Sequence, residues 1–212
     1  MNKLTEIANK CLTDKGSVFD SCHEFTEFYY DYFNQLKSRN EKIYILEIGV
    51  YQGASLKMYN EFFEHNCEVY AIDIDFSINE YEADNVHLFK FDATQKDNLD
   101  KFFEEIGDIK FDFILDDGSH WPKHQYATLL YTYKHLKEDG KYILEDLHTH
   151  GRGYVDDSPL YFLTFWNNPK ILLTKDIEEL KSVIDTSTIF VRNNPKSVLN
   201  GTSVTALITF KH

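Results

Sequence analysis

The sequence is short of cysteine. It has three, Cys11, Cys22 and Cys67, and no two of them form a CxxC pair. An odd number without that spacing argues against a disulfide framework and against a zinc site, and it favours a reducing compartment. The first ten residues lack the apolar core of a signal peptide, and no apolar run approaches the length of a membrane span. We therefore expect a cytoplasmic protein.

Basic residues are also scarce. Lysine and arginine total 22 against 35 aspartates and glutamates, which gives a net charge of −13. Nucleic acids and anionic membranes bind proteins through clustered basic side chains, so we expect neither as a partner. The charge balance suits a protein that binds a small molecule or a cation.

Internal repeats and low-complexity linkers are absent as well, and 212 residues suit one α/β domain. Aromatic residues make up 16%, which we interpret mostly as core and cleft lining. Apolar runs typical of buried strands alternate with stretches of helical spacing, which implies right-handed crossovers and a mainly parallel sheet. The expected strands are 42–50, 67–75, 86–92, 111–117 and 140–146, and the expected helices are 22–37, 54–65, 96–106 and 122–136.

The end of the chain has a different character. Two strand-like runs, 182–194 and 203–212, are separated by too few residues for a crossover helix, so they form a hairpin. We predict an α/β fold with a Rossmann-like, doubly wound, mainly parallel seven-stranded sheet and a C-terminal antiparallel hairpin. The chain would be a single domain, 1–212, with an N-terminal helical segment (1–40) before the core (41–212).

The loop after the first strand, "LEIGVYQGAS", lacks the GxGxxG spacing that holds a pyrophosphate, because three residues separate Gly49 from Gly53. A ligand without phosphates can use a looser turn, in which Gly49 lets the backbone approach it closely. The second strand ends at Asp73, where a carboxylate can accept hydrogen bonds from a ribose diol. Either feature alone suits an ordinary strand end, but together in one βαβ unit they favour a cofactor site.

Carboxylates follow two further strands. Asp116 and Asp117 end the fourth strand, and Glu145 and Asp146 end the fifth. The carboxyl ends of parallel strands meet at one edge of the sheet, where these groups would repel one another without a cation between them. Hard oxygen ligands suit Mg²⁺, and the lack of a Cys/His cluster argues against zinc. His120, three residues after Asp117, is placed to take a hydroxyl proton as general base.

Four motifs in order, "LTDKGS", "LEIGVYQGASLKMY", "DDGSH" and "ILEDLHT", resemble the metal-dependent sugar O-methyltransferases of macrolide and related natural-product pathways. These enzymes are class I S-adenosylmethionine-dependent methyltransferases. The resemblance implies S-adenosyl-L-methionine and Mg²⁺ (or Mn²⁺) as cofactors, with Asp117 and Asp146 as metal ligands and His120 as the base. It implies a small-molecule hydroxyl acceptor, a sugar or nucleotide-sugar, and it is compatible with a homo-oligomer.

Several assignments keep alternatives. Asp116 is a cofactor contact or a turn residue, Glu145 binds the metal, a water or a backbone amide, and Glu47 serves the cofactor, the metal or the loop. Thr13 and Lys15 would fold over the cofactor carboxylate or form a solvated junction. The segment 148–166, with His148 and His150, is an acceptor loop or a packing contact. The predicted cofactor-binding residues are Glu47, Gly49, Gly53, Ser55, Asp73, Asp92, Asp116, Thr13 and Lys15; the predicted metal ligands are Asp117, Asp146 and Glu145; the predicted catalytic residues are His120 and Asp117.

Three other functions compete with this hypothesis. The first keeps the chemistry and changes the acceptor to a catechol or a small oxyacid. The second is a catalytically silent Rossmann-like binding module. The third, a nicotinamide oxidoreductase, is disfavoured by the missing GxGxxG motif.

Overall fold

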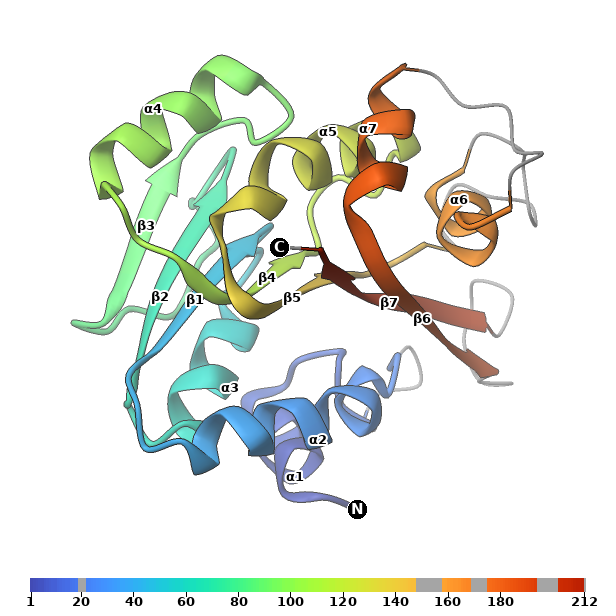
Figure 1. Ribbon diagram of the computed structural model, residues 1–212. Coiled ribbons are helices and arrows are strands. Elements are labelled where there is room, and N and C mark those ends of the chain that lie inside the picture. Colours follow the sequence, from blue (N-terminus) through green and yellow to red (C-terminus); the bar gives the residue numbers. More distant parts are fainter. Residues whose placement is uncertain (19–21, 148–157, 169–174, 194–201, 212) are drawn as a thin grey trace.

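A central sheet organises the molecule (Figure 1). The computed structural model describes residues 1–18, 22–147, 158–168, 175–193 and 202–211, and within them the sheet has seven strands in the order β3-β2-β1-β4-β5-β7-β6. The strands are β1 (Ile43–Ile48), β2 (Cys67–Asp73), β3 (Val86–Lys90), β4 (Phe111–Asp116), β5 (Leu136–Leu144), β6 (Ile184–Asn193) and β7 (Thr202–Phe210).

The first five strands are parallel, and the last two form the predicted hairpin. β1 pairs in parallel with β2 and β4, β2 with β3, and β4 with β5. β7 pairs antiparallel with both β5 and β6. The predicted fold class is therefore confirmed, including the antiparallel strand near the end of the chain.

Helices cover both faces of the sheet. In Figure 1, helices α1, α2 and α3 lie on one face, and α4, α5 and α7 lie on the other. Two apolar clusters match these two layers, one on each side of the sheet. The helices are α1 (Lys3–Cys11), α2 (Phe25–Ser38), α3 (Ala54–Phe62), α4 (Lys96–Ile106), α5 (Pro122–Thr132), α6 (Pro159–Phe165) and α7 (Lys175–Val183), with a 3₁₀ turn, η1 (Tyr133–His135), after α5.

Aromatic side chains fill the first of these layers. Phe33 on α2 stacks on Phe113 of β4 with ring centroids 4.6 Å apart, and Tyr59 of α3 meets Phe113 edge-on at 5.6 Å. All three residues have no exposed surface. This packing agrees with the interpretation of the aromatic content as core, and it ties the N-terminal helices firmly to the sheet.

Two boundaries differ from the sequence-based expectation. β5 begins at Leu136 rather than at residue 140, and the preceding helix ends correspondingly early. The reason is long-range pairing, since Leu136 pairs with Phe111 and the register then shifts before Phe113. Helix α7 was not expected. Helix α1 lies within the expected N-terminal helical segment, and the side chain of Asn2 caps it, accepting a hydrogen bond from the amide of Thr5 at 2.8 Å. Among the described residues, no helix is both long enough and apolar enough to span a membrane.

Candidate active site

A cavity of about 710 Å³ lies over the carboxyl ends of β1, β2 and β4. Its lining comes from the loops after β1 to β5 and from the connection between α1 and α2. Open α/β sheets bind ligands at this edge, and the volume lies in the range of small-molecule sites. Among the predicted site residues, Thr13, Lys15, Gly49, Ser55, Asp73, Asp92, Asp116, Asp117, His120 and Asp146 line it.

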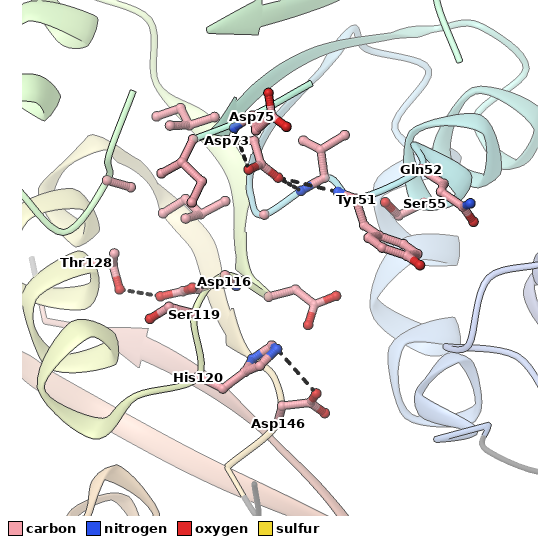
Figure 2. Close-up of a pocket in the computed structure, with 18 of the residues that line it drawn as sticks. Tyr51, Gln52, Ser55, Asp73, Asp75, Asp116, Ser119, His120, Thr128 and Asp146 are labelled. Atoms are coloured by element: carbon pink, nitrogen blue, oxygen red, sulfur yellow. Dashed lines mark hydrogen bonds and ion pairs between the residues drawn. The ribbon is translucent and has the colours of Figure 1, made fainter. Parts of the chain in front are cut away.

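The carboxylate of Asp73 holds the loop that follows β1 (Figure 2). Its Oδ2 accepts the amide N–H of Val50 at 2.7 Å and that of Tyr51 at 3.4 Å. Its Oδ1 accepts the amide of Asp75 at 3.1 Å. Asp73 therefore orders the loop after β1 as well as lining the cavity, a second role that its position at a strand end did not reveal.

Gly49 is required for a reason other than the predicted one. Its φ is +88°, and a Cβ at this position would lie 2.3 Å from the carbonyl oxygen of Asp117 and 2.8 Å from Cα of Gly118. The space beside Gly49 is thus filled by the loop after β4, which leads to the candidate metal ligands. The predicted close approach of a cofactor to Gly49 stays a prediction.

The other predicted cofactor residues fall into two groups. Ser55 and Asp92 line the cavity, and Asp92 accepts hydrogen bonds from the amide and hydroxyl of Thr94 at 3.0 and 2.6 Å. Glu47 is fully buried, and Tyr59 donates to its Oε1 at 3.3 Å. Burial raises the pKa of Glu47 to about 8. Gly53, with φ +80°, precedes α3.

Asp116 shapes the turn after β4. It accepts hydrogen bonds from the hydroxyls of Thr128 and Tyr142 (3.1 Å to the latter) and from the amide of Gly118 at 3.2 Å. Burial raises its pKa to about 6. These contacts favour the alternative that Asp116 is a turn residue, although it also lines the cavity.

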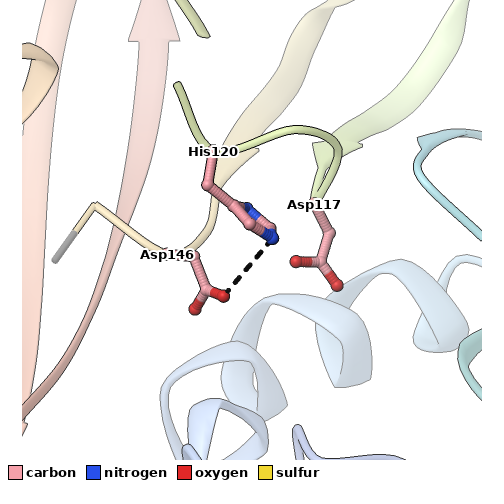
Figure 3. A group of neighbouring side chains, drawn as sticks. All are labelled: Asp117, His120 and Asp146. Atoms are coloured by element: carbon pink, nitrogen blue, oxygen red, sulfur yellow. Dashed lines mark ion pairs between the residues drawn. The ribbon is translucent and has the colours of Figure 1, made fainter. Parts of the chain in front are cut away.

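Asp117, His120 and Asp146 converge at one end of the cavity (Figure 3). Each offers a ligand atom, and these atoms all lie within 4.8 Å of one another. Nε2 of His120 lies 3.7 Å from Oδ2 of Asp146. His120 and Asp146 both have positive φ angles, 59° and 56°. Two non-glycine residues in this strained conformation, side by side at a cavity, are typical of a functional site.

The donor set of this group fits a divalent cation. Burial raises the pKa of Asp146, and the neighbouring charge of Asp117 raises it further. Within the described residues, Nδ1 of His120 is buried without a hydrogen-bond partner. The two carboxylates suit Mg²⁺ or Mn²⁺, which prefer oxygen ligands, and a bound cation would relieve the repulsion between them.

Lys15 lies against this group instead of in solvent. Its Nζ donates to Oδ2 of Asp117 at 2.5 Å and to Oε2 of Glu145 at 2.6 Å. Glu145 accepts a further hydrogen bond at Oε1 from the hydroxyl of Tyr29, at 2.7 Å. Both oxygens of Glu145 are thus engaged by protein groups, and this residue is not in the group of three; its role as a metal ligand stays a prediction.

His23 was missed by sequence reasoning. Its Nε2 lies 3.9 Å from Oδ1 of Asp146 and 3.7 Å from Oδ2 of Asp14, and its Nδ1 lies 2.7 Å from Oγ of Ser203. It sits on the side of Asp146 away from Oδ2, the oxygen that faces His120. A lone histidine between two helices carries no pattern that would have singled it out.

The aromatic segment near residue 160 is partly described. His148 and His150, with the rest of 148–157, lie outside the described residues. Within α6, Phe162 is buried, with its ring centroid 5.9 Å from that of Tyr126 on α5. Phe162 thus packs in the core, as one of the two interpretations expected, whereas Phe165 of the same helix is exposed.

The architecture defines a class. A mainly parallel sheet in this strand order, with β7 antiparallel between β5 and β6 and a cavity over β1, β2 and β4, is the fold of class I methyltransferases. The methyltransferase domain model of the Methyltransf_24 family matches residues 46–147, which contain all three residues of the metal-like group. The match covers a little under half of the chain and includes the strands that carry the cavity.

Two curated relatives are similar to the chain in sequence. The chain is 32% identical over 163 residues to demethylmacrocin O-methyltransferase of Streptomyces fradiae, covering 73% of this chain and 39% of the relative. It is 30% identical over 155 residues to mycinamicin VI 2''-O-methyltransferase of Micromonospora griseorubida, covering 69% of this chain and 36% of the relative. The chain thus spans well under half the length of these relatives.

Solved structures agree on the fold. MycE methyltransferase from the mycinamycin biosynthetic pathway, in complex with Mg, SAH and mycinamycin VI, matches with a TM-score of 0.73 at 22% identity. The match covers 100% of this chain and 54% of that chain. At this identity the likeness shows the architecture and not the substrate.

Proposed function

We propose that the protein is an S-adenosylmethionine-dependent, Mg²⁺-dependent O-methyltransferase that acts on a hydroxyl of a sugar or sugar-like small molecule in the cytoplasm. The names of the curated relatives, which are O-methyltransferases of macrolide pathways, support this reaction class. The MycE structures, with Mg and SAH bound, support the two cofactors. The observation that carries the proposal is the Asp117–His120–Asp146 group at one end of the same cavity that Asp73 lines.

The cofactor would occupy the part of the cavity between the loops after β1 and β3. Asp73 would accept hydrogen bonds from the ribose hydroxyls, and Asp92 would lie near the adenine. Ser55, at the start of α3, and Thr13, in the connection after α1, line the same space. The cofactor supplies the methyl group, and these residues bind it and orient it toward the acceptor.

The acceptor would lie between the cofactor and the group of three. A metal held by Asp117 and Asp146 would bind oxygens of the acceptor and lower the pKa of the hydroxyl to be methylated. His120 would take the hydroxyl proton at its Nε2, the nitrogen that faces Asp146 Oδ2 at 3.7 Å. Asp146 favours the imidazolium that results, and the packed β4 loop keeps Asp117 in place.

The test combines binding and turnover. Calorimetry with S-adenosylhomocysteine and a methyl-transfer assay on a panel of sugars, nucleotide-sugars and catechols separate the hypotheses. Chelator should abolish turnover, and Mg²⁺ or Mn²⁺ should restore it. Asp117→Asn and Asp146→Asn should lose turnover while still binding S-adenosylhomocysteine, because the metal serves the acceptor.

Three outcomes would redirect the proposal. Binding of S-adenosylhomocysteine without turnover on any acceptor would favour the silent binding module. Full turnover in the presence of chelator would mean that Asp117 and Asp146 do not act through a bound metal. Turnover on catechols alone would keep the chemistry and change the acceptor class.

A further inference from the structure

Tyr51, in the loop after β1, combines two features that are unusual for a tyrosine. Its φ angle is +51°, in the left-handed region that bulky side chains rarely adopt. The residue is also 69% exposed, although it lines the cavity. A ring with so little packing does not compensate the fold for the strain of its own backbone, and strained residues of this kind are typical of ligand-binding positions.

The strained backbone of Tyr51 is held from both sides. Oδ2 of Asp73 accepts the amide of Val50 at 2.7 Å and that of Tyr51 at 3.4 Å. The carbonyl of the next residue, Gln52, accepts the amide of Glu80 at 3.1 Å. These bonds tie the loop after β1 to the end of β2 and to the loop that follows it. The direction of the side chain is therefore fixed, and Figure 2 shows the ring pointing away from Asp73.

The ring of Tyr51 lies near the expected position of the cofactor sulfur. Among the described residues, Tyr51 and Phe91 are the two phenylalanines or tyrosines that line the cavity. Phe91 directly precedes Asp92, so it belongs to the adenine end. In S-adenosylmethionine the sulfur is joined to the ribose through a single carbon. Since the ribose would lie at Asp73, whose carboxylate holds the amide of Tyr51, the sulfur would be within reach of the Tyr51 ring.

We propose that the ring of Tyr51 forms a binding face for the sulfonium cation of S-adenosylmethionine. A cation within about 6 Å of the centroid of a tyrosine ring, over its face, is attracted by the quadrupole of the ring. The product, S-adenosylhomocysteine, lacks this positive charge, so Tyr51 favours the methyl donor over the product. This inference rests on the proposed function, because it assumes a cofactor with its ribose at Asp73.

A purely structural role for Tyr51 makes a different prediction. If the ring only packs and stabilises the loop after β1, its replacement lowers the melting temperature. Binding of S-adenosylmethionine and S-adenosylhomocysteine then weakens alike, because both molecules would contact the same loop. The ratio of the two affinities therefore separates the two roles.

Calorimetry of three ligands on the same protein batch measures this ratio. The ligands are S-adenosylmethionine, S-adenosylhomocysteine and sinefungin, which carries an ammonium group in place of the methylated sulfonium. Tyr51→Leu keeps an apolar side chain and removes the aromatic face, so the two cationic ligands should lose about 2–30-fold in affinity relative to S-adenosylhomocysteine. Tyr51→Phe retains the ring and should keep the wild-type ratio. Phe91→Leu makes the matched change at the other ring of the cavity and should leave the ratio unchanged.

Tyr51→Asn adds a readout of stability. Asparagine tolerates a positive φ better than tyrosine does, and the ring that it removes is largely exposed. The melting temperature should therefore stay level or rise, while the preference for the cationic ligands falls as in Tyr51→Leu. Loss of ligand preference without loss of stability is the behaviour of a binding residue and not of a packing residue.

Three results would overturn the inference. They are an unchanged ratio in Tyr51→Leu, an equal change of the ratio in Phe91→Leu, and a lower melting temperature of Tyr51→Asn with equally weakened binding of all three ligands. Absence of binding of all three ligands to the wild type and every variant would overturn it together with the proposed function. A ratio that responds to Tyr51 in a protein without methyl transfer would uphold it and refute the activity alone.

Discussion

Gly49 packs the loop after β1 against the loop that carries the candidate metal ligand Asp117, and Gly49→Ala tests that contact. Alanine at φ +88° costs about 1–2 kcal/mol in backbone strain. Its Cβ would also lie 2.3 Å from the carbonyl oxygen of Asp117, which forces the β4 loop to move, and overpacking of this kind costs about 1–3 kcal/mol. The sum, about 2–5 kcal/mol, corresponds to a fall in melting temperature of about 4–20 °C for a domain of this size.

Gly107 offers a matched control. Its φ is +72°, and a Cβ there would meet nothing within 4 Å, so Gly107→Ala carries the strain without the collision. Differential scanning calorimetry of both variants shows how much stability each loses, and Gly107→Ala reports the loss that backbone strain causes without a collision. Mn²⁺ affinity should fall by about 10–100-fold in Gly49→Ala, since Asp117 is displaced, and should not change in Gly107→Ala. Equal melting temperatures and equal Mn²⁺ affinities in the two variants would refute the idea that Gly49 positions the β4 loop.

Three further predictions concern single residues. His120→Ala should lower turnover by about 10²–10⁴-fold with S-adenosylhomocysteine affinity nearly intact. A near-normal rate per folded molecule would refute the assignment of His120 as the general base. Asp73→Ala should weaken S-adenosylhomocysteine binding by at least ~1.5 kcal/mol in calorimetry. Unchanged affinity would refute the predicted hydrogen bonds between Asp73 and the ribose. Burial lowers the pKa of His135 from 6.5 to about 4, so between these values the folded protein binds fewer protons than the unfolded chain and loses stability as the pH falls. His135→Phe keeps an aromatic ring beside Phe103. Urea titrations at pH 7 and pH 4 should show a smaller difference in unfolding free energy between the two pH values than in the wild type, and an equal difference would contradict the prediction.

The positions of the site residues that follow strand ends were predictable from the sequence. Asp117 and Asp146 lie far apart in the sequence, but each follows a strand of apolar residues, and parallel strands bring their carboxyl ends to one edge. The same rule places Asp73 over the cavity. The partners of these residues were harder to foresee, because strand order says nothing about which loop crosses the edge.

The N-terminal segment shows the limit most clearly. The pattern "LTDKGS" allowed either a cofactor contact or a solvated junction for Lys15, and the structure has it buried between Asp117 and Glu145. His23, close to Asp146, lies in the same connection and has no sequence signal at all. Both placements depend on how α1 and α2 pack against the sheet, which is a property of the aromatic core.

The sequence by itself determined the alternation of strands and helices, the terminal hairpin and the acidic ends of β4 and β5. These features are recorded in contiguous residues, through the periodicity of apolar side chains and the short distance between the last two strands. The tertiary structure alone decided which charge meets which carboxylate, the strained backbone of His120 and Asp146, and the collision that excludes a side chain at Gly49. Such features arise only when segments far apart in the chain are packed together, because close packing leaves each group one set of neighbours that no local pattern encodes.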